Sequence, residues 1–209
     1  IGIGKLGLCF ALTLEKAGYH VLGVDVSEEY VAKINSKKLA SPEANVEECL
    51  TQSQHFTATT GIKKGLSHSD VQFLFVATPS LPNGRYDHIQ VDNVVQQLIE
   101  NALPSKTKHL IIGCTTMPGY CDSVQERLQP YGYTVSYNPE FIAQGSVMRD
   151  LVHSDILLIG EGSESVGDAI VEIYLSIVEN EPTIHRMSRK EDLRISRSEA
   201  ISAVSPPKK

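Results

Sequence analysis

The chain has 209 residues, of which 41% are hydrophobic, so it is long enough to bury a substantial core in one large domain or two small ones. Its formal net charge of −6 argues against nucleic acid or an anionic membrane surface as a partner. Residues 186–209 hold seven of the 19 lysines and arginines, which leaves residues 1–185 clearly acidic. An anion bound there would depend on local backbone N–H groups and helix dipoles.

Cysteine usage and hydropathy exclude further classes of protein. The four cysteines, at positions 9, 49, 114 and 121, form no Cys-x-x-Cys pair and have no histidines at zinc-ligand spacing. We therefore expect neither a disulfide framework nor a metal site, and reduced cysteines of this kind are typical of a cytoplasmic protein. No run approaches about 20 apolar residues, so we expect no membrane-spanning helix.

The first segment has the order glycine turn, helix, strand, carboxylate. Gly2, Gly4 and Gly7 precede an apolar run without helix breakers that ends at Gly18, which predicts a helix. The run HVLGVD then predicts a strand that ends at Asp25, 18 residues beyond Gly7. This spacing is typical of a dinucleotide-binding fingerprint. A glycine-rich turn in another kind of α/β protein is the alternative.

In a dinucleotide-binding fingerprint, each of the three glycines has a separate role. Gly2 permits the tight turn, Gly4 lets the backbone approach a pyrophosphate, and Gly7 lets the helix pack closely on the sheet. Lys5 and Leu6 complete the loop. The pyrophosphate would lie at the helix N-terminus, where unpaired N–H groups and the positive end of the dipole favour an anion.

The acid at the end of the strand predicts which dinucleotide binds. Asp25 would accept a hydrogen bond from a ribose hydroxyl. A 2′-phosphate would face Asp25, with Glu28 and Glu29 close behind, and like charges at such distances repel. The sequence therefore predicts NAD rather than NADP. Only Ile1 precedes the glycines, so we expect the first strand of the unit to be incomplete.

The later elements alternate between strand and helix. Ser27 and Ser41 are expected to cap helices, the second with Pro42 at its first position. The expected helices cover 27–38, 41–52, 89–102, 119–132 with an interruption at Pro130, and 163–178; the expected strands cover 55–60, 71–80, 109–116, 133–141 and 155–160. Such alternation requires crossover connections. The sequence thus predicts an α/β, Rossmann-like, doubly wound fold with a mainly parallel sheet and helices on both faces.

Three segments place polar residues at expected carboxyl ends of strands, which is where ligands bind in open α/β sheets. They are ATPSLPNGRYD with Thr78, Pro79 and Ser80, GCTTMPGYCD with Thr115 and Thr116, and YNPEFIAQGSVMRD with Glu140 and Gln144. Any one of them could be only a capped turn between strand and helix. Together they predict a site.

The order of these motifs resembles the NAD-binding domain of the UDP-glucose/GDP-mannose dehydrogenase family. The matching motifs are GxGKLGL, VxGVD, TPS followed by NGxxD, Thr-x-x-Pro-Gly, YNPEF-x-x-QG-S-x-x-RD and a strand that ends in IG. The resemblance extends from Ile1 to about Glu191, and NPEF is its most distinctive motif. It implies a four-electron oxidation that takes the C6 primary alcohol of a sugar nucleotide to a carboxylate with two NAD molecules in succession.

The resemblance also implies roles for site residues. Thr115 would help to hold a catalytic water and the cofactor, and Thr78 and Pro79 would contribute to the cofactor site. Glu140 would act as a general base or position the water, and a desolvated carboxylate there would have a raised pKa. The alternative is that Glu140 caps a turn and stays ionised. Gln144 stands where many members have a second glutamate, and it cannot take a proton.

In this family a catalytic cysteine lies in a later domain, and none of the four cysteines here has that context. We therefore expect residues 1–185 to be an NAD-binding domain without turnover of its own, and 186–209 to be a poorly ordered basic tail, either solvated or against an acidic partner. UDP-glucose is the expected substrate as the commonest case, with GDP-mannose and N-acetylated UDP-hexosamines as alternatives. The full-length protein is expected to be a homo-oligomer.

Two other functions remain open from the sequence. The first is a hydroxy-acid dehydrogenase of the 6-phosphogluconate type, against which the NPEF and TPS motifs argue. The second is a non-catalytic fragment that binds a dinucleotide and regulates a full-length relative.

Overall fold

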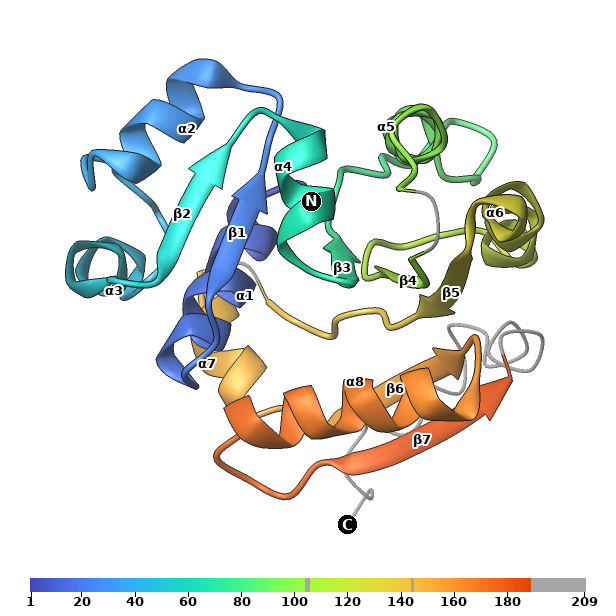
Figure 1. Ribbon diagram of the computed structural model, residues 1–209. Coiled ribbons are helices and arrows are strands. Elements are labelled where there is room, and N and C mark those ends of the chain that lie inside the picture. Colours follow the sequence, from blue (N-terminus) through green and yellow to red (C-terminus); the bar gives the residue numbers. More distant parts are fainter. Residues whose placement is uncertain (104–105, 144, 189–209) are drawn as a thin grey trace, which may run out of the picture.

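Strands and helices alternate along the chain, and the strands form two sheets (Figure 1). The computed structural model describes residues 1–103, 106–143 and 145–188. The smaller sheet pairs β1 (Val21–Val24) with β2 (Phe56–Thr59). The larger has the order β3-β4-β5-β6-β7, with strands at Val71–Leu74, Lys108–Ile112, Tyr133–Tyr137, Ile156–Glu161 and Thr183–Ser188. Neighbouring strands are parallel except β5 and β6.

Helices cover both faces of the larger sheet, as alternation along β4 shows. Ile111 packs in one core with residues of α1 and α8, whereas Leu110 and Ile112 pack in a second core with residues of α5 and α6. Successive side chains of a strand point to opposite faces, so the two cores lie on opposite sides of the sheet. The helices are α1 (Lys5–Lys16), α2 (Glu28–Asn35), α3 (Val46–Gln52), α4 (Ile62–His68), α5 (Ile89–Glu100), α6 (Tyr120–Leu128), α7 (Val147–Val152) and α8 (Glu164–Ile177), with a 3-10 turn at Gln129–Tyr131. The α/β, doubly wound prediction is confirmed.

The start of α3 differs from the sequence-based expectation. Ser41 was expected to cap a helix with Pro42 at its first position, but α3 begins at Val46 after Asn45 in the left-handed region (φ 67°). The Ser41 hydroxyl instead accepts a hydrogen bond from the Glu43 N–H. Glu43 is 4% exposed, and its carboxylate binds a distant loop. The tertiary role of Glu43 therefore overrides the local helix signal.

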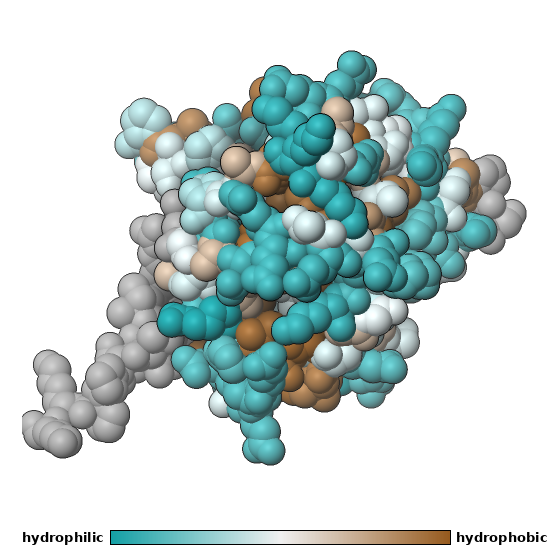
Figure 2. Space-filling view, turned by 90° about the vertical axis from the view of Figure 1, so that its left-hand side faces the viewer, coloured by the Kyte–Doolittle hydropathy of each residue, from teal (hydrophilic) through white to brown (hydrophobic). Residues whose placement is uncertain are grey.

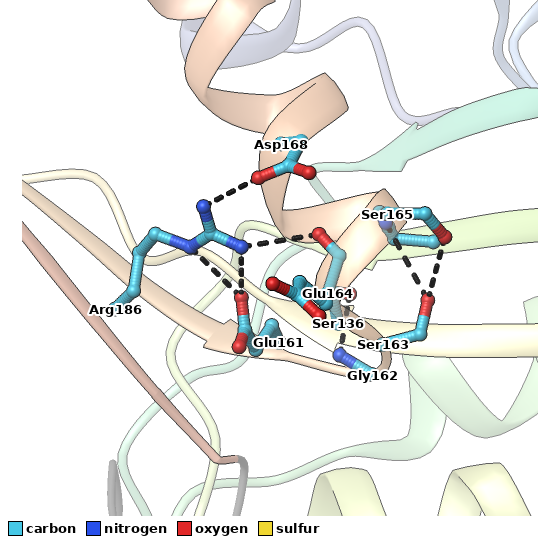
Figure 3. A network of polar contacts seen from close by, with 9 residues as sticks. Ser136, Glu161, Gly162, Ser163, Glu164, Ser165, Asp168 and Arg186 are labelled. Carbon is cyan, nitrogen blue, oxygen red and sulfur yellow. Dashed lines mark hydrogen bonds and ion pairs between the residues drawn. The ribbon is translucent and has the colours of Figure 1, made fainter.

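The last strand of the sheet extends the domain past its expected boundary. Residue 185 was the expected end, but β7 continues to Ser188. Arg186 donates from Nε and Nη2 to the Glu161 carboxylate at 2.9 and 2.8 Å, and from Nη1 to Asp168 at 2.5 Å (Figure 3). These bonds join β7 to β6 and α8. Residues 186–188 also pair in parallel with Ile159–Glu161 of β6, so they belong to the sheet. The rest of the expected tail, 189–209, lies outside the described residues.

The molecular surface is mostly polar on the side that Figure 2 shows, with hydrophobic residues in separate patches. Large apolar side chains such as Leu98 and Leu110 are fully buried in the core instead. Within the part of the chain that the structure describes, no helix combines the length and the apolar composition needed to cross a bilayer.

Candidate functional site

At the glycine turn near the N-terminus, backbone atoms of different segments lie very close together. Gly2 has φ +77°, and a Cβ there would lie 2.7 Å from the Phe75 carbonyl oxygen. A Cβ on Gly7 would lie 2.0 Å from the Gly2 carbonyl oxygen. Neither neighbour is a side chain that could turn away. The first turn of α1 thus approaches the sheet as closely as the sequence interpretation of Gly2 and Gly7 requires.

Gly4 lies at the same turn but faces open space. It is the N-cap of α1, it is exposed, and a Cβ there would meet no atom within 4 Å. Among the described residues no side chain caps the helix, and its first turn holds no acidic residue. The N–H groups of Lys5, Leu6 and Gly7 have no partner within the helix, because an α-helix leaves its first donors free. This helix end therefore fits an anionic group that approaches the backbone at Gly4.

Asp25 lies against the glycine turn. Its carboxylate accepts hydrogen bonds from the Ile3 N–H and the Ser27 N–H, both at 3.1 Å. The side chain is half-buried, and an ionised carboxylate has about four acceptor positions, so two remain for hydroxyl donors. The turn and the acid together form a site with backbone donors on one side and an acceptor on the other. That donor set fits a dinucleotide with a pyrophosphate and a free ribose diol.

The three polar segments expected at strand ends, called corners from here on, follow three neighbouring strands. Thr78 follows β3, Thr115 follows β4 and Glu140 follows β5, and these strands are adjacent and parallel. The Gly113 N–H donates to the Leu74 carbonyl and the Asn138 N–H to the Ile112 carbonyl, so the corners start from hydrogen-bonded strand ends. Parallel strands end at one edge of a sheet. The structure therefore brings the three corners to the same edge.

The first corner is a small hairpin. The Leu81 N–H donates to the Arg85 carbonyl at 2.7 Å, and Gly84 has φ +76°, which is the turn that Asn83-Gly84 predicts. The Pro79 carbonyl accepts the Asp87 N–H at 2.9 Å, which anchors the base of the hairpin. Thr78 is partly exposed at this base.

The second corner leaves Thr115 exposed at the carboxyl end of β4. Gly119 adopts φ +80° as the N-cap of α6, as a Pro-Gly turn before a helix requires. The neighbouring Cys114 thiol is 8% exposed, and burial raises its pKa to about 11. Cys9 is fully buried, and burial raises its pKa to about 12. Both thiols stay protonated at neutral pH, so neither is a reactive nucleophile.

Glu140, at the third corner, has a neutral-range pKa. Burial raises the pKa of its carboxyl to about 7, and a hydrogen bond from the Tyr174 hydroxyl opposes that rise. Tyr174 lies on α8 and is 2% exposed. The raised pKa agrees with the expectation of a desolvated carboxylate and argues against a permanently ionised turn cap. Tyr174 has the helical spacing of a core residue in the expected helix 163–178, and nothing in that pattern identifies it as a partner of Glu140.

The titration of Glu140 gives a testable pH dependence. The folded-state pKa of about 7 exceeds 4.5, the ordinary value for a glutamate side chain, so the folded chain binds more protons between these values. This contribution to stability is present below pH 4.5 and is lost as pH rises through about 7. We expect the wild-type chain to lose roughly 1–3 kcal/mol relative to Glu140→Gln over that interval in urea unfolding.

Tyr174→Phe is the matched control for that titration. It removes the donor that favours the ionised carboxylate, so the pH at which the stability falls should move upward. Parallel pH profiles for the wild-type chain and Glu140→Gln would show that Glu140 does not titrate in this range.

The loop after Glu140 is anchored by a residue far away in the sequence. The buried Glu43 carboxylate accepts the Gly145 N–H at 2.9 Å and the Val147 N–H at 3.4 Å. Gln144, the second residue expected at this corner, lies outside the described residues. Glu43 was missed as part of the site because its segment resembled the start of a helix.

Comparison with known proteins identifies the family of the chain. Residues 1–178 match the family model described as the UDP-glucose/GDP-mannose dehydrogenase family, NAD binding domain. The chain belongs to this family. The predicted resemblance is thereby confirmed, and so is NAD as the cofactor of the domain.

Individual relatives agree with the family match. GDP-mannose 6-dehydrogenase from Pseudomonas aeruginosa is 29% identical over 185 residues, which cover 83% of this chain and 42% of that protein. UDP-glucose 6-dehydrogenase from Bacillus subtilis is 27% identical over 192 residues, covering 83% of this chain and 41% of that protein. The chain thus spans less than half the length of these relatives.

Solved structures show the same fold. A ternary complex of GDP-mannose dehydrogenase from Pseudomonas aeruginosa superposes with a TM-score of 0.87 at 27% identity, covering 97% of this chain and 48% of that one. A UDP-glucose dehydrogenase from Pyrobaculum islandicum gives 0.83 at 21% identity, covering 96% and 48%. The second likeness shows the fold alone.

Proposed function

We propose that this chain is the cofactor half of a nucleotide-sugar 6-dehydrogenase, which oxidises the primary alcohol of a UDP- or GDP-sugar to a uronate. The observation that carries the proposal is the pairing of an open, uncapped α1 N-terminus at Gly4 with Asp25 held at the same turn. The names of the relatives supply the substrate class, and UDP-glucose is the substrate proposed for this protein.

The NAD site consists of residues from the first βα turn and two strand ends. The pyrophosphate would bind to the N–H groups at the start of α1, and Asp25 would accept a ribose hydroxyl. The proposed cofactor-binding residues are Gly2, Gly4, Lys5, Leu6, Gly7, Asp25, Thr78, Pro79 and Thr115. Bound NAD supplies the hydride acceptor for each of the two oxidations.

Glu140 is the proposed proton acceptor. As an alcohol loses hydride from carbon, its hydroxyl proton must move to a base, and an effective base has a pKa near the working pH. The pKa of about 7 meets that condition. Thr115, exposed at the adjacent strand end, would hold a water molecule or the substrate hydroxyl in line with this carboxylate. Gln144 would contribute hydrogen bonds but no proton transfer.

The wider setting follows from the same proposal. All four cysteines lie within the described residues as free thiols, which favours the reducing cytoplasm as the location. A homo-oligomer is proposed for the full-length enzyme. Residues 1–185, extended to Ser188 by β7, are proposed as the cofactor domain.

The purified chain should bind NAD but show negligible NADH formation from UDP-glucose. The reason is that the aldehyde intermediate of this family reacts with a cysteine thiolate, whereas Cys9 and Cys114 are buried with raised pKa values. Absorbance of NADH at saturating UDP-glucose measures turnover, and a full-length relative serves as the positive control. Steady NADH formation by the chain alone would contradict the assignment of a cofactor half.

A further inference from the structure

A pair of stacked rings joins the first corner to the second. His88 follows the first corner directly and precedes α5, and Tyr120 lies in the second corner and begins α6. The two ring centroids are 3.8 Å apart and the ring planes are inclined by 22°. Both side chains are half-buried, and α5 and α6 pack beside each other in one core (Figure 1). Neither ring is among the residues proposed above for NAD binding or proton transfer.

The His88 ring also binds the backbone of the second corner. The Met117 N–H donates a hydrogen bond to His88 Nε2 at 3.2 Å. A backbone N–H can only donate, so Nε2 must offer a lone pair, and the imidazole is neutral with its proton on Nδ1. Met117 lies two residues beyond Thr115, and its carbonyl accepts the Tyr120 N–H at 3.0 Å. The bond to His88 therefore anchors the middle of the second corner.

The backbone on both sides of His88 is fixed by hydrogen bonds. The Asp87 N–H donates to the Pro79 carbonyl at 2.9 Å, and the Asp87 carboxylate accepts the Ile89 N–H at 2.9 Å. The His88 carbonyl accepts the Asp92 N–H at 2.8 Å, which begins the hydrogen bonding of α5. The base of the hairpin and the start of α5 thus determine where the His88 ring lies.

Tyr120 is fixed by a charged pair. Its hydroxyl donates to Asp92 Oδ1 at 3.0 Å, and Arg127 Nη1 donates to the same oxygen at 2.5 Å. Asp92 lies on α5 and Arg127 on α6, so these bonds join the helices that follow the two corners. The Tyr120 ring is therefore held in place as a flat surface on which the His88 ring stacks.

Protonation of His88 is incompatible with the bond to Met117. The added proton would occupy Nε2, and an imidazolium donates from both ring nitrogens, so it cannot accept the Met117 N–H. Two N–H groups would then face each other between nitrogens that lie 3.2 Å apart. The second corner would have to move away from His88 and would lose this anchor.

The surroundings of His88 favour the neutral ring. Burial is the largest effect and lowers the pKa of His88 below its ordinary value of 6.5. The carboxylates of Asp92 and Asp87 oppose this shift, and the Arg85 guanidinium adds to it. The titratable and charged groups that face the ring from the elements packed against it are Arg85, Asp87, Asp92, Tyr120 and, through Asp92, Arg127. The anchoring bond is thus present above pH 6.5 and is lost as pH falls through the lowered pKa.

We propose that His88 is a positioning residue for the candidate NAD site: its neutral ring, stacked on Tyr120, holds the second corner against the first and thereby fixes Thr115 for the cofactor. The inference rests on the proposed function, in which Thr115 contacts NAD. Thr78 and Thr115 follow the neighbouring strands β3 and β4, so the bond from Met117 to His88 helps to set the spacing of the two corners. Because protonation of His88 releases the second corner, NAD affinity should fall in mildly acidic solution.

Calorimetric titration of NAD at about pH 7.5 and about pH 5 tests the inference. His88→Gln keeps an oxygen that can accept the Met117 N–H but cannot be protonated, whereas His88→Ala removes the acceptor. At the higher pH, we expect the Kd of His88→Ala to exceed that of the wild-type chain by about threefold or more. At the lower pH, the ratio of the wild-type Kd to that of His88→Gln should rise by about threefold or more. Titration of Glu140 occurs in both forms and cancels in this ratio.

Hydrogen exchange of the Met117 amide, measured without NAD, reports on the bond itself. At about pH 7.5 its protection factor should be about tenfold higher in the wild-type chain and His88→Gln than in His88→Ala. At about pH 5 the wild-type value should fall toward that of His88→Ala. His153→Gln is the matched control and should change neither readout, because His153 lies at the end of α7 and faces Glu179 at 3.7 Å. Circular dichroism confirms that every form is folded at both pH values.

Two results would overturn the proposal. Equal Met117 protection in the wild-type chain and His88→Ala would show that the ring does not hold the second corner. The expected amide changes with equal NAD affinities in all forms would show that His88 does not position the cofactor site. Failure of every form to bind NAD would instead contradict the proposed function, and the Met117 amide would still decide whether His88 holds the corner.

Discussion

Gly7→Ala should lower the free energy of unfolding by about 3 kcal/mol or more, the largest loss of stability expected from any substitution of a single glycine in the first turn. The added Cβ would lie 2.0 Å from the Gly2 carbonyl oxygen and 3.0 Å from its carbonyl carbon. Both atoms belong to the backbone, so α1 must move away from the turn. That movement would also displace Phe10, which packs against Phe73 and Phe75.

Urea unfolding followed by circular dichroism measures this loss. Gly61→Ala is the matched control, because its added Cβ would have only ordinary contacts, the nearest at 3.6 Å from the Thr59 hydroxyl oxygen. Equal midpoints for Gly7→Ala and the wild-type chain would mean that α1 does not pack on the turn as described.

Gly4→Ser, unlike Gly7→Ala, should leave the stability of the chain unchanged but weaken its affinity for NAD. Gly4 is the N-cap of α1, has φ −62° and has nothing within 4 Å of its would-be Cβ, so serine fits and is a preferred capping residue. Its side chain would stand where the pyrophosphate approaches the backbone, and its hydroxyl would compete for the helix N–H groups. We expect the Kd for NAD to rise about tenfold or more, equivalent to about 1.4 kcal/mol.

Calorimetric titration of NAD into Gly4→Ser and wild-type chains measures the difference, and Tm values confirm that both are folded. An unchanged Kd would place the pyrophosphate elsewhere. Together with Gly7→Ala, this variant separates the glycine that shapes the turn from the glycine that faces the ligand.

Local sequence patterns predicted the helices and strands whose formation depends mainly on nearby residues. The helix from Lys5 to Lys16 and the strand that ends before Asp25 follow from apolar periodicity and glycine positions, and both are present. Ser27 caps α2 through a hydrogen bond from the Tyr30 N–H, as its sequence indicates.

Tertiary contacts account for what the sequence did not predict. Glu43 has the composition of a helix start, yet its carboxylate anchors a loop more than 100 positions away, a partner that no local pattern contains. Tyr174 has the spacing of a core residue and also carries a hydroxyl that reaches Glu140. Strand β7 has an irregular pattern of exposure, pairs with β6 along its whole length, and is also bound through Arg186 to acidic partners on β6 and α8. The short helices α4 and α7 likewise lack a strong periodic signal.

The carboxyl edge of the sheet depends both on local sequence patterns and on tertiary packing. Thr78, Thr115 and Glu140 were expected at strand ends from sequence order alone, and the strands that precede them are neighbours in the sheet. Strand order is set by packing, however, so the adjacency of these three strands could be established only in three dimensions.

The most direct test of the central claim is a calorimetric comparison of NAD and NADP binding to the unchanged chain. Asp25 is fixed at the glycine turn by the Ile3 and Ser27 N–H groups, so a 2′-phosphate would be placed beside a carboxylate. We predict that NAD binds with a Kd at least about tenfold lower than that of NADP. Equal affinities, or tighter binding of NADP, would contradict the assignment of Asp25 and the α1 N-terminus as the NAD site.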